Sequence, residues 1–360
     1  MSACGHGSTQ LKPNQPSPRW ESANLDFLRA IAVLLVFVFH LLITFNVKPW
    51  MEMGRFGVLI FFVHTSLVLM LSLERLESRG ESIFRSFYLR RVFRIYPLSI
   101  FWVSLIVIWH VARAPWWPWQ NPTAWEIICN LLLCMNLFYV EPVTSVLWSL
   151  PYEVEMYLVL PLLYLFGKRK GFRGMCMLWV ISVGVALVQP HISGRLSLAG
   201  FGPCFVAGVL AYFLGFKRLS PRFPFLLWPA TIAGAAGVLI GLERLGVGLQ
   251  EASWPACLLI GVAVPYFREL RWKPLRTASA LIARYSYGIY LTHLTVMWFS
   301  FVILRSYPAF IQWTVFVTLS VAVPVALYHW LEAPMIKAGA YIVSRLKKSP
   351  ETSDLVIAAG

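Results

Sequence analysis

Long apolar runs, separated by short basic loops, fill the chain between residues 25 and 337. A helix that crosses a bilayer needs about 20 apolar residues. The polar stretches on either side predict an N-terminal tail, 1–24, expected to be cytoplasmic and disordered, and a cytoplasmic C-terminal tail, 339–360, around one membrane domain, 25–338. The runs predict an all-α, polytopic integral membrane bundle of about ten transmembrane helices: 25–46, 55–73, 95–112, 152–167, 174–190, 198–214, 225–242, 252–267, 284–304 and 310–337.

One further run, 123–140, decides the orientation of every later segment. It contains Glu126, Asn130 and Asn136 among apolar residues. If it does not cross, most of the 31 Lys and Arg residues fall on the side of the N-terminus, which is the distribution expected of cytoplasmic loops. If it did cross, the later basic loops would lie outside. We therefore predict that both termini are cytoplasmic and that 123–140 is re-entrant or packs on the outer face.

The composition agrees with a membrane protein, since 58% of the residues are hydrophobic and 13% are charged, against about a quarter charged in soluble proteins. The net charge of +15 is carried mainly by the basic loops, so we attribute it to orientation in the membrane and expect no nucleic-acid partner. The six cysteines form no Cys-x-x-Cys pair, which predicts free thiols and no metal site. No cleavable signal peptide is evident, so the first apolar run is expected to serve as the membrane address.

Two polar side chains share one face of the first predicted span. Arg29 and His40 are eleven residues apart, which on a helix is three turns plus about 20° and about 16 Å along the axis. Asp26 lies one turn before Arg29 on nearly the same face. Because a charge at the bilayer centre costs about 2.5 to 3.5 kcal/mol, such residues face a protein interior or a wet cavity and are functional candidates. A structural histidine, bonded to a neighbouring helix, is the alternative for His40.

A basic cluster precedes the third predicted span in "FYLRRVFRIYP". Arg91 and Arg94 are three residues apart and therefore neighbours on a helix face, whereas Arg90 points elsewhere. Guanidinium groups bind phosphate in a bidentate manner. The pair, together with Arg29, predicts an anion clamp at the cytoplasmic face that could hold a diphosphate-bearing donor. A plain positive-inside anchor is the alternative.

Three later stretches place further polar groups within or beside apolar runs. "WSLPYEVEMY" brings Glu153 and Glu155 into the start of a span, on different sides of a helix, and an interaction of Glu153 with the helix dipole is the structural alternative. "RYSYGIYLTHL" contains Tyr287 and His293, and "LEAP" places Glu332 near the inner end of the last span. These residues are additional candidates for the site.

Taken together, these stretches resemble the acyltransferase-3 family of integral membrane O-acyltransferases over roughly residues 22–338. The matches are the Arg-x10-His of Arg29 and His40, the Arg-x-x-Arg of Arg91 and Arg94, and the "WSLPYEVEMY", "YSYGIYLTHL" and "LEAP" stretches. The resemblance implies transfer of an acyl group, usually acetyl from acetyl-coenzyme A, to a hydroxyl of a carbohydrate or glycoconjugate such as a cell-surface polysaccharide or lipopolysaccharide. It also implies a multi-pass protein of the plasma (inner) membrane, in contact with lipids, that uses acyl-coenzyme A as substrate and has no bound cofactor.

The resemblance also implies roles for individual residues. His40 corresponds to the family's catalytic base, and Arg29, Arg91 and Arg94 correspond to its donor contacts. The second span departs from the family pattern, because "FFVHTSLVLM" has His-Thr-Ser where Leu-Ser-Gly is usual. This departure adds His64 as a second candidate titrating group.

The mechanism leaves two points open at this stage. A neutral imidazole suits removal of a hydroxyl proton, and a carboxylate could orient it as in catalytic triads, but Glu153, Asp26 and other groups are all candidates for that role. Direct transfer and a covalent acyl-histidine relay are both possible. A proton-coupled transporter, using intramembrane His, Glu and Arg, is the alternative from another class, although no internal repeat supports it. The Trp-rich loop 113–122 offers flat surfaces on which an acceptor could stack.

Overall fold

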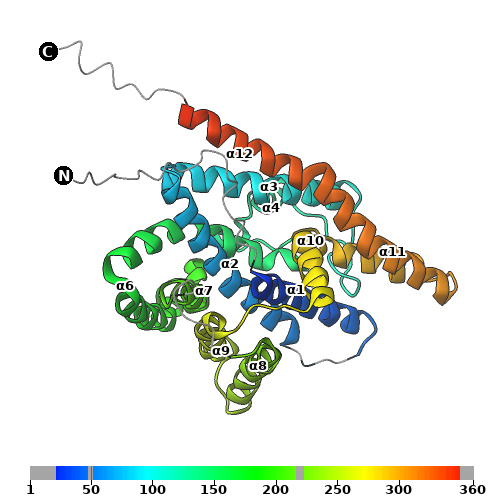
Figure 1. The fold of residues 1–360 in the computed structure, drawn as a ribbon. Coiled ribbons are helices and arrows are strands. Elements are labelled where there is room, and N and C mark those ends of the chain that lie inside the picture. The colour runs from blue at the N-terminus through cyan, green and yellow to red at the C-terminus, as the bar shows by residue number, and fades with distance from the viewer. Residues whose placement is uncertain (1–21, 48–49, 51, 216–222, 349–360) are drawn as a thin grey trace, which may run out of the picture.

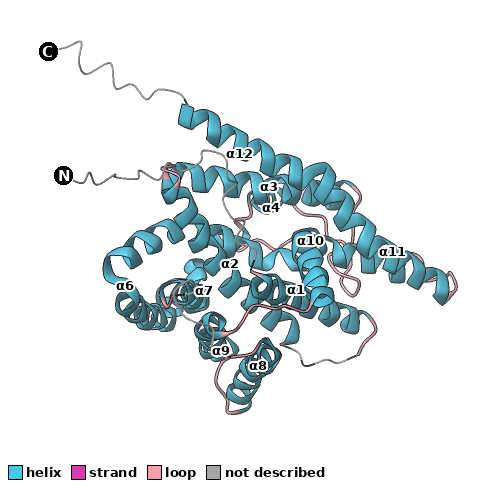
Figure 2. Ribbon diagram, in the orientation of Figure 1, coloured by secondary structure: helices cyan, strands magenta, loops and turns pink. Residues whose placement is uncertain are grey.

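The computed structural model describes residues 22–47, 50, 52–215 and 223–348. Figure 2 shows these residues as helices joined by loops, with no strand drawn among them, as the all-α prediction requires. The α-helices are α1 (Ala23–Thr44), α2 (Met53–Ser78), α3 (Ile83–Ile108), α4 (Ala124–Leu132), α5 (Met135–Phe138), α6 (Leu150–Ile192), α7 (Leu198–Phe213), α8 (Trp228–Arg244), α9 (Leu249–Ala263), α10 (Lys273–Trp298), α11 (Ala309–Leu327) and α12 (Ala333–Lys348).

Within the described residues, eight helical segments are long and apolar enough to cross a membrane. The predicted runs 152–167 and 174–190 both belong to α6, which continues through a kink at Gly171, where φ is 64° and ψ is −165°. The predicted run 252–267 gives α9, which has only 15 residues. The chain is therefore a helical integral membrane protein, while the number of ten crossings and the side of the termini stay predictions.

The ends of the membrane domain differ slightly from the predicted boundaries. α1 begins at Ala23, capped by the Ser22 side chain, which accepts a hydrogen bond from the Leu25 amide. Residues 1–21 of the predicted N-terminal tail lie outside the described residues. At the other end, α12 continues past residue 338 to Lys348, so the predicted C-terminal tail starts inside a helix.

The run 123–140 forms two short helices, α4 and α5, instead of one long helix. Thr123 and Glu126 form a capping box at the start of α4, and Leu133 ends it in a left-handed conformation with φ of 53°. A helix of nine residues is about 14 Å long, roughly half the hydrocarbon thickness of a bilayer. Because it is this short, α4 does not cross a bilayer as a helix. It packs against α3.

The centre of the bundle is built from α1, α2 and α10, which lie side by side in Figure 1, with α7 and α9 packed against the other side of α2. Glycines allow this close packing, as small residues do at helix interfaces in membranes. A Cβ atom on Gly57 of α2 would lie 2.6 Å from the Ala32 carbonyl oxygen of α1, and one on Gly208 of α7 would lie 2.1 Å from the Val63 carbonyl oxygen. α12 lies along α3.

Candidate active site

An arginine-lined cavity lies among α1, α2, α3, α6 and α10. We call it the inner cavity, because it contains the side chains predicted to bind a donor on the cytoplasmic side. Its polar lining comes from helices that are far apart in sequence, so only the tertiary structure assembles it. The polar lining residues are Arg29, His64, Thr65, Arg91, Arg94, Ser149, Glu153, Tyr157, Ser286, Tyr287 and Tyr290.

Arg91 and Arg94 enter the inner cavity from one face of α3, as their spacing predicted. Arg90 points away and forms an ion pair of 3.0 Å with Glu81. Arg94 forms an ion pair of 2.9 Å with Glu332, whose carboxylate side chain is only 1% exposed. Glu332 ends a π-helical turn, Tyr328–Glu332, that joins α11 to α12, and such turns are frequent at functional sites.

Arg29 reaches the inner cavity from α1. Its Nε donates a hydrogen bond of 2.7 Å to the Ser286 hydroxyl of α10, and that hydroxyl donates to the Ala283 carbonyl at 2.8 Å. Further along α1, His40 lies 3.0 Å from His293, which is also on α10. The face of α1 that carries Arg29 and His40 is therefore the face that packs against α10, as the prediction of a shared face requires.

Glu153 lies with the arginines in the inner cavity. Its carboxylate accepts a hydrogen bond of 3.0 Å from the Thr65 hydroxyl of α2. Glu155, on another side of α6, accepts one of 2.7 Å from Asn136, so the two carboxylates diverge as predicted. The contacts of Glu153 place it beside the predicted donor clamp.

A second hollow continues from the inner cavity, since Arg29, His64, Val68 and Arg94 line both. We call it the entry hollow. It adds Asp26, as well as two arginines that the sequence analysis did not single out, Arg75 and Arg284. Each lies at an end of a predicted span, in "LERLE" and "ARYSYG". There the sequence pattern indicates only a positive charge that orients the loop in the membrane.

His64, at the departure from the family pattern, lies inside this polar region. Its side chain is buried and lines both hollows together with Arg29. No pattern in the sequence connects His64 with Arg29, because the two residues are on different helices.

His40 is absent from the lining of the inner cavity and pairs with a second histidine instead. The Nδ1 atom of His40 lies 2.9 Å from the Val36 carbonyl oxygen and 3.0 Å from Nε2 of His293. Trp116, from the Trp-rich loop, stacks on the His40 ring with centroids 5.8 Å apart and planes 10° apart. We call His40 and His293 the histidine pair.

Tyr290 of α10 lies beside both the inner cavity and the histidine pair. Tyr290 lines the cavity, and its ring centroid is 6.1 Å from that of His293. Its hydroxyl lies 2.7 Å from Ser149 Oγ and donates to the Val146 carbonyl at 2.8 Å. Tyr287, one turn earlier, donates to the Ile95 carbonyl of α3 at 2.9 Å, so both hydroxyl groups are anchored to neighbouring segments.

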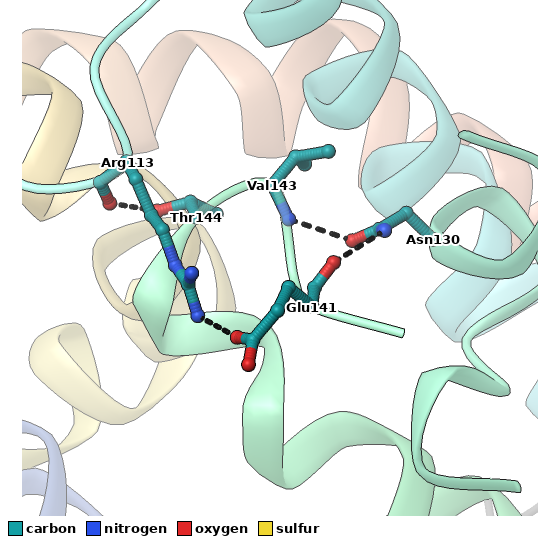
Figure 3. Close-up of polar contacts among 5 residues, drawn as sticks. All are labelled: Arg113, Asn130, Glu141, Val143 and Thr144. Carbon is teal, nitrogen blue, oxygen red and sulfur yellow. Dashed lines mark hydrogen bonds and ion pairs between the residues drawn. The ribbon is translucent and has the colours of Figure 1, made fainter. Parts of the chain in front are cut away.

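The loop that carries Trp116 is held to the segment before α6 by the contacts in Figure 3. Arg113 forms an ion pair with Glu141, and its carbonyl accepts from the Thr144 hydroxyl at 3.2 Å. The Asn130 side chain of α4 donates to the Glu141 carbonyl at 3.1 Å and accepts from the Val143 amide at 2.9 Å. These bonds fix the position of the loop over His40.

Comparison with known proteins gives the family. The family model described as an acyltransferase domain matches residues 22–329. The O-acetyltransferase OatA of Staphylococcus aureus strain NCTC 8325 / PS 47 is 29% identical over 202 residues, which are 52% of this chain and 32% of that protein. OatA of strain COL matches to the same extent. The chain thus spans about a third of the length of these relatives, and no solved structure matches.

The structure is thus a helical membrane bundle with an arginine-lined cavity and, close to it, the half-buried His40 paired with the buried His293. The chain belongs to the acyltransferase-3 family, a family of acyltransferases. Membership favours the enzyme over the transporter considered above, and it is consistent with the geometry around Arg29, Arg91 and Arg94.

Proposed function

We propose that this protein is a membrane-bound O-acyltransferase that moves an acyl group, most simply acetyl, from acyl-coenzyme A to a hydroxyl of a carbohydrate or glycoconjugate acceptor. The observation that carries the proposal is the meeting of Arg29, Arg91 and Arg94 in one cavity that continues into a hollow lined by Arg75 and Arg284. Coenzyme A bears a diphosphate and a further phosphate, and arginines are suited to bind both.

The donor is proposed to enter at the cytoplasmic face of the plasma (inner) membrane. In this arrangement its phosphates lie in the entry hollow and at the arginine-lined part of the inner cavity, and its thin pantetheine arm extends from there toward Ser149 and Tyr290. The thioester then reaches the region next to the histidine pair. Acyl-coenzyme A acts as a substrate, and the proposal needs no resident cofactor or metal.

His40 is proposed as the group that does the chemistry, through its Nε2 atom. As a general base, Nε2 takes the proton of the acceptor hydroxyl, the oxygen attacks the thioester carbon, the C–S bond breaks, and the proton passes to the coenzyme A sulfur. In a covalent relay, Nε2 attacks the thioester carbon, the C–S bond breaks and coenzyme A leaves as its thiolate; the acceptor hydroxyl then takes the acyl group from the imidazole and gives its proton to that thiolate. Both routes give the same products.

The acceptor is proposed to approach from the outer face across the Trp-rich loop. Trp116 and Trp117 are each 42% exposed, and Trp116 is stacked on His40. Aromatic rings offer flat apolar surfaces on which sugar rings can pack. The name of the OatA relatives refers to O-acetyl transfer, which supports a hydroxyl acceptor here.

The proposal is tested with the purified protein in lipid nanodiscs and with cells. Binding of coenzyme A and release of its thiol from acetyl-coenzyme A are measured on the protein, and acetylation of surface glycans is measured by mass spectrometry in cells with and without the gene. We expect binding, thiol release and gene-dependent acetylation. A protein that binds no coenzyme A and leaves glycan acetylation unchanged would refute the proposal.

A further inference from the structure

The histidine pair contains two bonds that determine where its protons lie. The Nδ1 atom of His293 lies 2.8 Å from the Tyr290 carbonyl oxygen and 3.1 Å from the Ile289 carbonyl oxygen. Carbonyl oxygens only accept hydrogen bonds, so Nδ1 must carry a proton. In a neutral imidazole the other nitrogen is then an acceptor. Nε2 of His293 therefore presents a lone pair.

That lone pair faces His40. Nδ1 of His40 lies 3.0 Å from Nε2 of His293 and 2.9 Å from the Val36 carbonyl oxygen. Both neighbours are acceptors, so Nδ1 of His40 must be the donor. The proton of a neutral His40 is consequently on Nδ1, and Nε2 is left with its lone pair.

The surroundings favour two neutral imidazole rings over a pair in which one ring is a charged imidazolium. His293 is 2% exposed, and the rings next to the pair are aromatic, namely Phe37, Phe39, Trp116 and Tyr290. Burying an uncompensated charge among such groups is costly. In a catalytic triad, a carboxylate accepts the hydrogen bond from Nδ1–H of the histidine. Here the imidazole of His293 accepts it instead, and no permanent negative charge is placed within the membrane.

We propose that His293 is a positioning residue that holds His40 in the Nδ1–H tautomer and so keeps Nε2 free for the acyl transfer. This rests on the proposed function only for the use of Nε2, since the tautomer itself follows from the contacts. Both the general-base route and the acyl-histidine route require a free Nε2. When Nε2 of His40 gains a proton or an acyl group, Nδ1–H becomes a stronger donor and its bond to His293 strengthens.

The first test reads the tautomer directly. The full-length protein is labelled with ¹⁵N-histidine in lipid, and the signals of its seven histidines are compared with those of His40→Ala to identify His40. We expect a protonated Nδ1 and an unprotonated Nε2 on His40. A spectrum with the proton on Nε2 overturns the inference, whatever the activity.

The second test uses two amide variants that differ by one methylene. His293→Asn can still donate to the Tyr290 carbonyl, but it is too short to reach His40. His293→Gln can bring its amide oxygen to the place of Nε2 and accept from His40. The pair therefore separates the bond within α10 from the bond to His40.

Thiol release from acetyl-coenzyme A gives the expected pattern. His293→Asn should lower kcat by about 10- to 100-fold, the range for losing a hydrogen bond to a group that becomes charged, while His293→Gln stays within a few-fold of the unmodified protein. The donor KM should be unchanged in both. Equal losses in both variants, or a change confined to KM, would mean that His293 has only a packing role. If the unmodified protein shows the expected tautomer but binds no coenzyme A and leaves glycan acetylation in cells unchanged, the proposed function fails and the tautomer assignment stands.

Discussion

Arg29 and His40 share one face of α1 but lie in opposite environments. Arg29, near one end, lies among charged groups that line two connected hollows. His40, near the other end, contacts a neutral histidine, a backbone carbonyl and aromatic rings. Under the proposed function, one helix face would separate the two tasks of a transferase: positive charge where phosphates could neutralise it, and an uncharged base where a charge among aromatic rings would be costly.

The two hollows at the Arg29 end contain a surplus of positive charge that suits an anionic ligand. Glu332 is paired with Arg94, and Glu153 is bonded to Thr65 beside the arginines, yet the polar lining of both hollows contains more arginines than carboxylates. A buried surplus of this kind is expected where an anionic ligand completes the charge balance. The predictions below test whether the two ends separate binding from chemistry.

The largest effect is expected for His40→Ala. Removing the base should lower acyl transfer by about 100- to 10,000-fold and more if His40 carries the acyl group, while coenzyme A still binds because His40 is outside the inner cavity. In-cell acetylation at matched expression and coenzyme A binding to the purified variant measure the two properties. Near-normal transfer by His40→Ala, with loss in His64→Ala, would move the catalytic role to α2.

The arginine clamp predicts a loss of affinity. Arg91→Ala and Arg94→Ala should each weaken coenzyme A binding by about 1 to 3 kcal/mol, the scale of a charge-assisted hydrogen bond. Lys should restore only part of the loss, because the bidentate guanidinium is gone. Arg90→Ala is the matched control, since Arg90 is adjacent in sequence but pairs with Glu81. Equal affinities in all three Ala variants would leave these arginines a role in orientation only.

Glu153→Gln tests whether this carboxylate only holds Thr65 beside the arginines or orients His40 for catalysis. The amide oxygen can keep the bond from Thr65, so we expect thiol release to change by less than about tenfold, on the scale of a single hydrogen bond. If Glu153 instead oriented His40 as the aspartate of a triad does, the same change would cost about 10,000-fold, as it does in serine proteases. Thiol release at saturating acetyl-coenzyme A decides between them.

His64→Ala should have a small effect, confined to the affinity for coenzyme A. The variant removes part of the wall of both hollows beside Arg29. We expect coenzyme A affinity to fall by about 0.5 to 1.5 kcal/mol, the value of one hydrogen bond, with kcat unchanged. Titration of coenzyme A against the variant provides the measurement, and a lowered kcat at unchanged affinity would contradict it.

The side of the membrane that each end of α1 faces can be tested without changing activity. Lys170 is exposed, next to the kink of α6 at Gly171. A single cysteine there, in an otherwise cysteine-free variant, should resist an impermeant thiol reagent in intact cells and react once the membrane is opened. Labelling in intact cells would place the Arg29 end outside and reverse the proposed path of the donor.

Local periodicity was enough to predict several features of this site. The spacing of Arg29 and His40 placed them on one face, and the spacing of Arg91, Arg94 and Arg90 separated two arginines from the third, because a helix repeats every 3.6 residues wherever it packs. Hydropathy likewise predicted an all-helical membrane protein and showed 123–140 to be exceptional. These properties depend on residues within one helix or on the solvent around it.

The tertiary structure alone decided which faces meet. It brought His293 to His40 and His64 to Arg29, and it placed Glu153 with the arginines although the sequence left it as a candidate partner of His40. It also joined two predicted spans in α6 across Gly171. Hydropathy could not predict these contacts, because lipid and protein interiors are similarly apolar, and helix pairing in membranes depends on close packing and a few polar bonds between segments distant in sequence.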